Sequence, residues 1–149
     1  MTREEFIKAL KAKSYSYEIV GDKLIVTHSG SVNLRSLKTL PSGVEFKNRE
    51  DVYLTKLVTL PSGVEFNNGG YVNLSSLETL PSRQRFNNKG DIELAKLSTI
   101  HSGVEFKNEG DVYLEALTGD WFSEWEGNIE GIGNKTILNT MIKRELFSE

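Results

Sequence analysis

Cysteine is absent from this sequence of 149 residues, and histidine occurs only at His28 and His101. Without cysteine, neither a disulfide framework nor a thiolate metal site can form. A catalytic nucleophile with its base needs histidine, cysteine or an activated serine, and both histidines fall in predicted turns. No phosphate-binding loop, zinc-ligand spacing or dinucleotide-binding fingerprint is present either. The sequence therefore predicts a protein that is not an enzyme and has no cofactor and no metal site.

Long apolar runs and a strong charge of one sign are also missing. No apolar run approaches the roughly 20 residues that a transmembrane helix requires, and the charged N-terminal segment lacks the apolar core of a signal peptide. The formal net charge is −3, and lysine and arginine never occur in a run longer than two residues. Such a charge pattern disfavours binding to nucleic acid or to an anionic membrane. We expect a soluble, cytoplasmic protein.

What the sequence has instead is a repeat with a period of 20 residues, which places its apolar residues in columns. The main columns are Val32, Val52, Val72, Ile92 and Val112; Leu34, Leu54, Leu74, Leu94 and Leu114; Leu37, Leu57, Leu77, Leu97 and Leu117; Leu40, Leu60, Leu80 and Ile100; and Phe46, Phe66, Phe86 and Phe106. A fixed period of this length indicates a solenoid, in which each coil buries its apolar face against its neighbours. We expect a single domain with an N-terminal cap at 1–28, a solenoid of about five coils at 29–117 and a C-terminal cap at 118–149.

Each coil contains two short segments with the alternation that is typical of a β-strand. In the second coil, Val52 and Leu54 are expected to point inward from the first strand, and Val64 and Phe66 from the second. The LPSG sequence between them predicts a corner, because proline cannot donate to a strand ladder and glycine permits a sharp turn. The FxNxG sequence that follows the phenylalanine predicts the other corner. The predicted fold class is therefore mainly β, a repeat solenoid.

Two features of the corners admit more than one interpretation. The asparagine column consists of Asn48, Asn68, Asn88 and Asn108. We expect these amides to bond turn backbone or the next asparagine, and the alternative is a binding site. In coil three, Arg83, Gln84 and Arg85 replace the glycine, valine and glutamate of the neighbouring coils. Either the corner bulges there, or Gln84 finds a backbone partner.

The N-terminal segment has the signals of a helix followed by a hairpin. Thr2 and Glu5 predict a capping box before a helix at about residues 3–12. Gly21 and Asp22 separate two β-rich runs, which suits a type I′ or type II′ hairpin. We expect this segment to cover the first coil of the solenoid.

The C-terminal segment is expected to cover the last coil. Trp121, Phe122 and Trp125 lie close together, and Asn134 is a candidate cap for a final helix that carries apolar residues. Burial against the last coil is the favoured role of the tryptophans, and the alternative is an aromatic docking patch.

The repeat resembles that of short leucine-rich-like repeat proteins from bacteria and their phages, which have the form LPxGVxFxNxGDVxLxxLxxLP. The matching segments here are LPSGVEFKN, LPSGVEFNN and GDVYL, within residues 29–117, and the end helices are similar as well. The LxxLxLxxN order of ordinary leucine-rich repeats is missing, so we favour a β-solenoid over a horseshoe with helices on its convex side. The resemblance implies a binding scaffold without catalytic residues, and several small phage proteins of this size inhibit host immunity.

The outward side of the first strand in each coil, which we call the first-strand face, varies most between repeats while the inward residues stay fixed. We therefore expect this surface to be free of folding constraint. The candidate partner-binding residues are Asp51, Tyr53, Tyr71, Asn73, Asp91, Glu93, Asp111, Tyr113 and Glu115. Tyrosine offers a large contact area at little entropic cost, and carboxylates attract a basic partner, so this composition favours a protein interface. The alternative is that tyrosine serves strand pairing alone. Calcium binding is disfavoured, because the aspartates do not match the GGxGxDxUx repeat.

Two classes of function are consistent with this sequence. The first is a protein-binding module that blocks a basic surface of a partner. The resemblance extends it to a phage-encoded inhibitor of a bacterial immune system, anti-CRISPR-like or directed at another defence. The second is a structural role, in which the protein self-assembles without catalysis.

Overall fold

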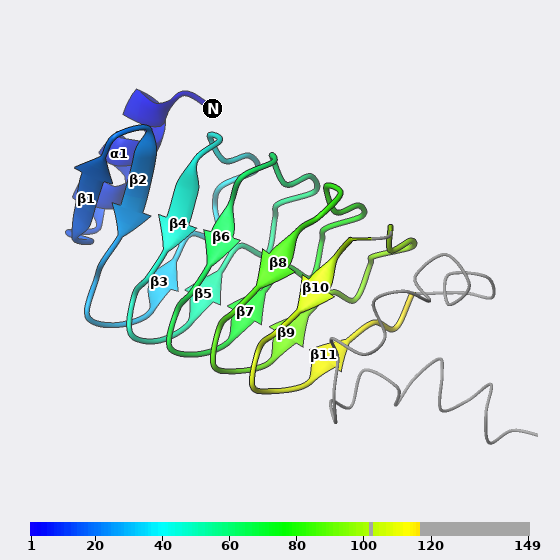
Figure 1. The fold of residues 1–149 in the computed structure, drawn as a ribbon. Coiled ribbons are helices and arrows are strands. Elements are labelled where there is room, and N and C mark those ends of the chain that lie inside the picture. The colour runs from blue at the N-terminus through cyan, green and yellow to red at the C-terminus, as the bar shows by residue number, and fades with distance from the viewer. Residues whose placement is uncertain (102, 117–149) are drawn as a thin grey trace, which may run out of the picture.

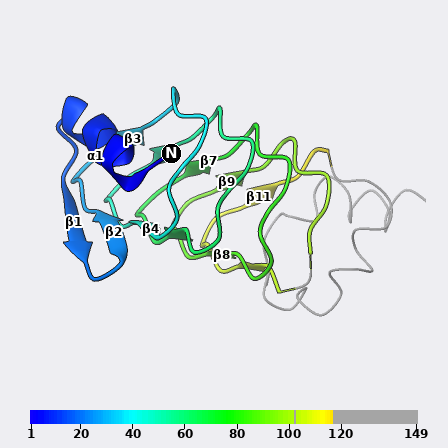
Figure 2. The same cartoon turned by 90° about the horizontal axis from the view of Figure 1, so that it is seen from above.

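The computed structural model describes residues 1–101 and 103–116, in which stacked strands form a β-solenoid. Each complete coil contributes one strand to each of two sheets, and the sheets run beside each other along the molecule (Figure 1). Seen from above, the coils follow one another from the N-terminal helix towards the last described strand, β11 (Figure 2). The predicted fold class is therefore confirmed.

The first-strand sheet consists of five two-residue strands in the order β11-β9-β7-β5-β3. These are β3 (Val32–Asn33), β5 (Val52–Tyr53), β7 (Val72–Asn73), β9 (Ile92–Glu93) and β11 (Val112–Tyr113). Their parallel register places residues 20 apart beside each other, as with Val52 and Val72. Because every coil has an apolar residue at the same place, this register buries the whole column.

The second-strand sheet has the order β1-β2-β4-β6-β8-β10, and it is parallel from β2 to β10. Its solenoid strands are β4 (Val44–Phe46), β6 (Glu65–Phe66), β8 (Arg85–Phe86) and β10 (Glu105–Phe106). Together the described strands make four complete coils, and β11 begins a fifth. This agrees with the period of the sequence.

The N-terminal cap consists of helix α1 (Arg3–Ala12) and a hairpin of β1 (Tyr17–Val20) and β2 (Lys23–Val26). Strand β2 pairs in parallel with β4, so the hairpin extends the second-strand sheet. Of the two turn residues, only Gly21 has a positive φ, of +60°, which fits the type II′ alternative.

Helix α1 begins and packs as its sequence predicts. The Thr2 side chain accepts from the backbone N–H of Glu5, and the Glu5 carboxylate accepts from the backbone N–H of Thr2. Two side chains of the helix, Phe6 and Leu10, are fully buried in the core cluster. The helix therefore contributes apolar cover to the N-terminal end of the solenoid.

Strand β1 forms the edge of the second-strand sheet at this end. Its side chains Ile19 and Val20 are 52% and 57% exposed. The cap thus replaces the edge of the first coil with the edge of β1.

A phenylalanine column runs through the core behind the second-strand sheet. Phe46, Phe66, Phe86 and Phe106 are all fully buried. Adjacent ring centroids lie 5.3 to 5.4 Å apart, and the rings are nearly parallel. Each inner ring is therefore covered by the rings of the coils before and after it.

The asparagine column is buried at the second corner of the coils. In coil two, Nδ2 of Asn68 donates to the carbonyl of Glu50 at 3.0 Å. It also donates to the carbonyls of Gly70 and Tyr71, at 3.2 and 3.1 Å. The same three contacts recur at the other asparagines, Asn48, Asn88 and Asn108. The predicted bonds to turn backbone are confirmed.

In coil three, the side-chain amide of Gln84 is buried and bonds to backbone carbonyl groups. Gln84 is buried, and its Nε2 donates to the carbonyls of Val64 and Arg85 at 2.9 and 3.0 Å. This is the second of the two alternatives for this coil. Arg83 has a φ of +64°, whereas glycine occupies the equivalent positions in the neighbouring coils with φ between +76° and +88°.

Replacing Arg83 with glycine is expected to raise the free energy of unfolding by about 1 kcal/mol, because a left-handed backbone costs about 1 to 2 kcal/mol at a residue with a Cβ atom, partly offset by the entropy of glycine. Equilibrium unfolding in urea measures the change. Gly63→Ala is the matched converse, because a Cβ atom at Gly63 meets no close neighbour and only its φ of +83° opposes alanine. It should destabilise the protein. An Arg83→Gly variant no more stable than the wild type would contradict the prediction.

Residues 102 and 117–149 lie outside the described part of the chain, and so do the candidate cap residues Trp121, Phe122, Trp125 and Asn134. Within residues 1–101 and 103–116, the structure contains no helix with the length and apolar character that a membrane span requires.

Candidate functional site

All nine candidate partner-binding residues share the outer side of the first-strand sheet. The register of β5, β7, β9 and β11 places four of them in one row: Tyr53, Asn73, Glu93 and Tyr113. Alternation along the strands places the other five on the same side: Asp51, Tyr71, Asp91, Asp111 and Glu115. Glu115 is exposed and the other eight are half-buried. The structure therefore presents these residues to solvent on one surface.

The N-terminal part of this face is an ordered group of aromatic and charged side chains. The guanidinium carbon of Arg35 lies 4.1 Å from the ring centroid of Tyr53. The Tyr53 and Tyr71 rings meet edge to face, with centroids 6.0 Å apart. The Tyr53 hydroxyl donates to Oδ2 of Asp51 at 2.9 Å, and this bond raises the pKa of Tyr53. These contacts hold the rings in place, which lowers the entropy that a partner must remove on binding.

Sequence reasoning missed the contact between Arg35 and Tyr53. The repeat aligns Arg35 with Thr55, two residues beyond the tyrosine, and the long side chain reaches back across the strands. Diagonal neighbours in a sheet lie within reach of long and aromatic side chains. That rule applied to the aligned repeats is the signal that could have found the pair.

The C-terminal part of the face collects negative charge. Burial, followed by repulsion from Glu115, raises the pKa of Glu93 to about 7. Burial, followed by the charge of Glu93, raises the pKa of Tyr71 to about 12. The charge of Asp91 is the main reason that the pKa of Tyr113 is raised. Each of these raised pKa values means that the folded protein disfavours the ionised form of the side chain.

The Glu93 shift predicts how stability depends on pH. Its folded-state pKa of about 7 exceeds the usual 4.5, so the folded protein holds this proton more tightly than the unfolded chain. The resulting stabilisation is complete below pH 4.5 and is lost as the pH rises towards 7. We expect Glu93→Gln to be more stable than the wild type at pH 8 by about 1 kcal/mol, a value reduced for solvent screening.

Urea unfolding at pH 5, 6.5 and 8 measures this difference. Glu65→Gln on the second-strand sheet is the control, because Glu65 pairs with Lys23 at 3.1 Å and should gain nothing from the change. The prediction is wrong if the wild type and Glu93→Gln lose stability equally between pH 5 and pH 8.

Two aspartates of the first-strand face also hold the backbone of the next coil. Oδ1 of Asp51 accepts from the backbone N–H of Tyr71 at 2.9 Å, and Oδ1 of Asp91 accepts from that of Asp111 at 2.8 Å. These carboxylate oxygens lie so close to Gly70 and Gly110, the residues before the two donors, that a Cβ atom on either glycine would collide with them. The expectation that this face is free of folding constraint is therefore wrong for Asp51 and Asp91.

Asn73 likewise has a structural contact. Its Oδ1 accepts from the backbone N–H of Ser75 at 3.0 Å, as Oδ1 of Asn33 does from Arg35 at 3.1 Å. Such local bonds end a strand and begin a turn. Substitutions on this face are best made at Tyr53, Tyr113, Glu93 and Glu115, because they leave the backbone contacts of the aspartates and of Asn73 intact.

The outer side of the second-strand sheet differs, because its carboxylates are paired with cations. The pairs are Lys23 with Glu45 and Glu65 at 3.5 and 3.1 Å, and Glu105 with Arg85 and Lys107 at 3.4 and 3.1 Å. By contrast, Asp91 and Glu93 pair with no lysine or arginine within the described residues. The first-strand face therefore carries negative charge that the neighbouring strands do not neutralise.

Metal binding receives no support from the geometry of the described residues, which hold no group of three or more carboxylate, histidine or cysteine side chains placed around a common point. The candidate functional site consists of the aromatic and acidic side chains of the first-strand face. No protein-family model, curated protein or solved structure matches this chain.

Proposed function

We propose that the protein is a binding module whose first-strand face docks on a basic surface of a partner protein. The observation that carries the proposal is that partly exposed tyrosines share this face with Asp91 and Glu93. Neither of these carboxylates pairs with a lysine or arginine within the described residues. A lysine or arginine of the partner placed between Glu93 and Glu115 would relieve their repulsion. The same contact would favour the ionised form of Glu93 and so lower its pKa.

Such a module acts by occupying the surface of its partner. Carboxylates presented in a row compete with the phosphates of a nucleic acid for the same basic groups. The family resemblance extends the proposal to a phage inhibitor that blocks a bacterial defence protein in this way.

Capture from a bacterial lysate on immobilised protein, followed by mass spectrometry, tests the proposal. Wild-type protein should retain a specific basic partner that a variant with Tyr53→Ala and Tyr113→Ala does not retain. Thermal unfolding of the variant confirms that it is folded. Equal retention by both proteins would contradict docking through this face.

Once the partner is identified, Tyr53→Ala and Tyr113→Ala should each weaken binding by more than about 1 kcal/mol, as truncation of interface aromatic residues commonly does. Glu93→Gln and Glu115→Gln should mainly slow association and reduce its dependence on salt, because peripheral charges steer the encounter. Surface plasmon resonance at several salt concentrations separates these effects.

Glu65→Gln and Glu105→Gln on the second-strand sheet are the matched controls for these measurements. Both residues are already paired with cations, at 3.1 Å from Lys23 and Lys107 respectively. If only the control variants lose binding, the partner occupies the other sheet.

Self-assembly is the second candidate function, and the exposed edge of β1 favours it. Within residues 1–101 and 103–116, no strand pairs with the outer edge of β1, which lies beside the exposed Ile19 and Val20, and such edges can pair with another chain. Light scattering of the purified protein distinguishes the two functions. A monomer that still captures its partner supports the binding module, and a particle that captures nothing supports self-assembly.

A further inference from the structure

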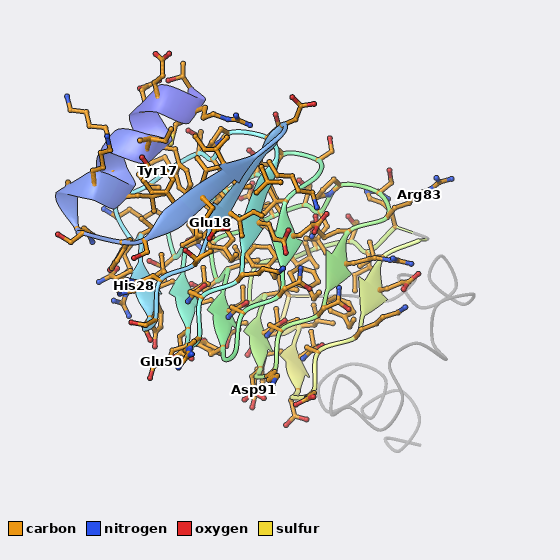
Figure 3. The ribbon with its side chains drawn as sticks, turned by 60° about the vertical axis from the view of Figure 1, so that its left-hand side comes forward. Tyr17, Glu18, His28, Glu50, Arg83 and Asp91 are labelled. Carbon is orange, nitrogen blue, oxygen red and sulfur yellow. The ribbon has the colours of Figure 1, made fainter. Side chains whose placement is uncertain are left out.

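A polar cleft of about 280 Å³ lies at the corner between coils two and three. Its lining includes Ser62, Ser82, Glu65, Arg83, Gln84 and Arg85. Figure 3 shows Arg83 and Asp91 on well separated parts of the molecule, so the cleft is distinct from the first-strand face. Its volume lies just below the range of about 300 to 1,000 Å³ that is common for ligand pockets, so it suits a small ligand.

The residues that distinguish coil three from its neighbours are the ones that line this cleft. Arginine, glutamine and arginine stand where coils one, two and four have glycine, valine and glutamate. At two of the three positions the repeat's own residue is better for folding. Arg83 adopts the left-handed conformation that suits glycine, and Gln84 buries an amide where valine would fill the core. Strained backbone of this kind concentrates at sites with a function.

The charge of the cleft is positive. Arg83 pairs with no carboxylate within the described residues. Arg85 contacts Glu105 at 3.4 Å, but Glu105 also pairs with Lys107 at 3.1 Å and would keep that partner if Arg85 turned away. The one acidic residue of the lining, Glu65, is held by Lys23 at 3.1 Å. Two guanidinium groups can therefore serve a ligand.

We propose that this cleft binds a small anion through a carboxylate or phosphate group. Arg83 and Arg85 supply planar guanidinium donors, which match the oxygens of either group in pairs. Ser62 and Ser82 line the same cleft, and a serine hydroxyl group can donate to a remaining oxygen. The altered residues of coil three form this site, and the other coils have glycine, valine and glutamate at the equivalent positions.

Two-dimensional NMR of the full chain tests the proposal directly. Sodium phosphate and sodium succinate are titrated separately, with sodium chloride at matched ionic strength as the reference. We expect saturable shifts of the Arg83 and Arg85 side-chain N–H signals, and of the amides at 62–65 and 81–85, with at least one of the two anions. The anion that saturates identifies phosphate or carboxylate as the preferred group.

The variants Arg83→Gly and Arg85→Gln should each weaken this binding at least tenfold. Arg83→Gly restores the glycine of the neighbouring coils, so its melting temperature should rise while its binding is lost, and unfolding cannot explain the loss. Arg49→Gln, at an exposed arginine outside the cleft, is the control and should bind as the wild type does. Shifts that do not saturate with either anion, or that persist unchanged in Arg83→Gly, would overturn the proposal.

Discussion

Replacing Phe66 with alanine should destabilise the solenoid by about 3 to 5 kcal/mol, the usual cost of emptying a buried phenylalanine site. The ring lies between Phe46 and Phe86, with both centroid distances at 5.4 Å, and it is fully buried. Its removal leaves a cavity that the neighbouring rings cannot fill, because each is fixed by the register of its own strand. Chemical denaturation monitored by circular dichroism measures the loss in the free energy of unfolding.

The position of Phe66 within the stack adds a second expectation. In a solenoid each coil contacts only its neighbours, so a defect in coil two weakens the link between the capped end and coils three and four. The unfolding transition should therefore broaden as well as shift. Val58→Ala is the control, because Val58 is 44% exposed and its truncation should change stability little. An unchanged midpoint for Phe66→Ala would show that the ring column does not hold the coils together.

The coil architecture could be predicted from the sequence because one rule, the period of 20, fixes many contacts at once. A parallel register that pairs Val52 with Val72 follows when each coil repeats the same inward residues. The choice at Gln84 could not be predicted in the same way. It depended on whether two carbonyl oxygens, of Val64 and Arg85, lay within reach of one amide, and both do.

The membership of the first-strand face could also be predicted, because alternation along a strand determines which side a residue takes. The energetic roles within it could not. Asp91 looked like a variable surface carboxylate, yet it accepts from the backbone of the next coil. The pKa of Glu93 depends first on its burial and then on Glu115, which lies in another coil and comes near only after folding. The rule for diagonal neighbours can bring Glu93 and Glu115 together once the repeats are aligned, but it gives neither the burial of Glu93 nor the bond of Asp91 to the backbone.

The second corner of each coil requires a side chain that can donate hydrogen bonds to several carbonyl groups, as the asparagine column does. Nδ2 of Asn68 serves three carbonyl oxygens, while its Oδ1 is buried without a hydrogen-bond partner within the described residues. The site therefore uses the donor end of the side chain alone. A group that keeps the shape of asparagine but cannot donate should be worse than a simple truncation.

Asn68→Asp is accordingly expected to cost about 3 to 5 kcal/mol at pH 7, the range for an uncompensated buried charge. Asn68→Ala should cost less, about 2 to 3 kcal/mol, because the two N–H groups of the asparagine amide are shared among three carbonyl oxygens, each hydrogen bond is worth about 1 kcal/mol, and no charge is buried. Equilibrium unfolding of both variants beside the wild type gives the ranking. A smaller loss for aspartate than for alanine would show that the carbonyl oxygens do not face this side chain.

The pH dependence of the aspartate variant separates charge from shape. Three carbonyl oxygens around the introduced carboxyl oppose its ionised form, so its folded-state pKa should lie well above the unfolded value of about 3.9. The stability deficit relative to wild type should then be smallest below about pH 4 and should grow as the pH rises through the folded-state pKa. The alanine variant has no such group, so its deficit should stay constant over the same range. Equal pH profiles for the two variants would mean that the buried corner admits water, and that the asparagine column is held by shape alone.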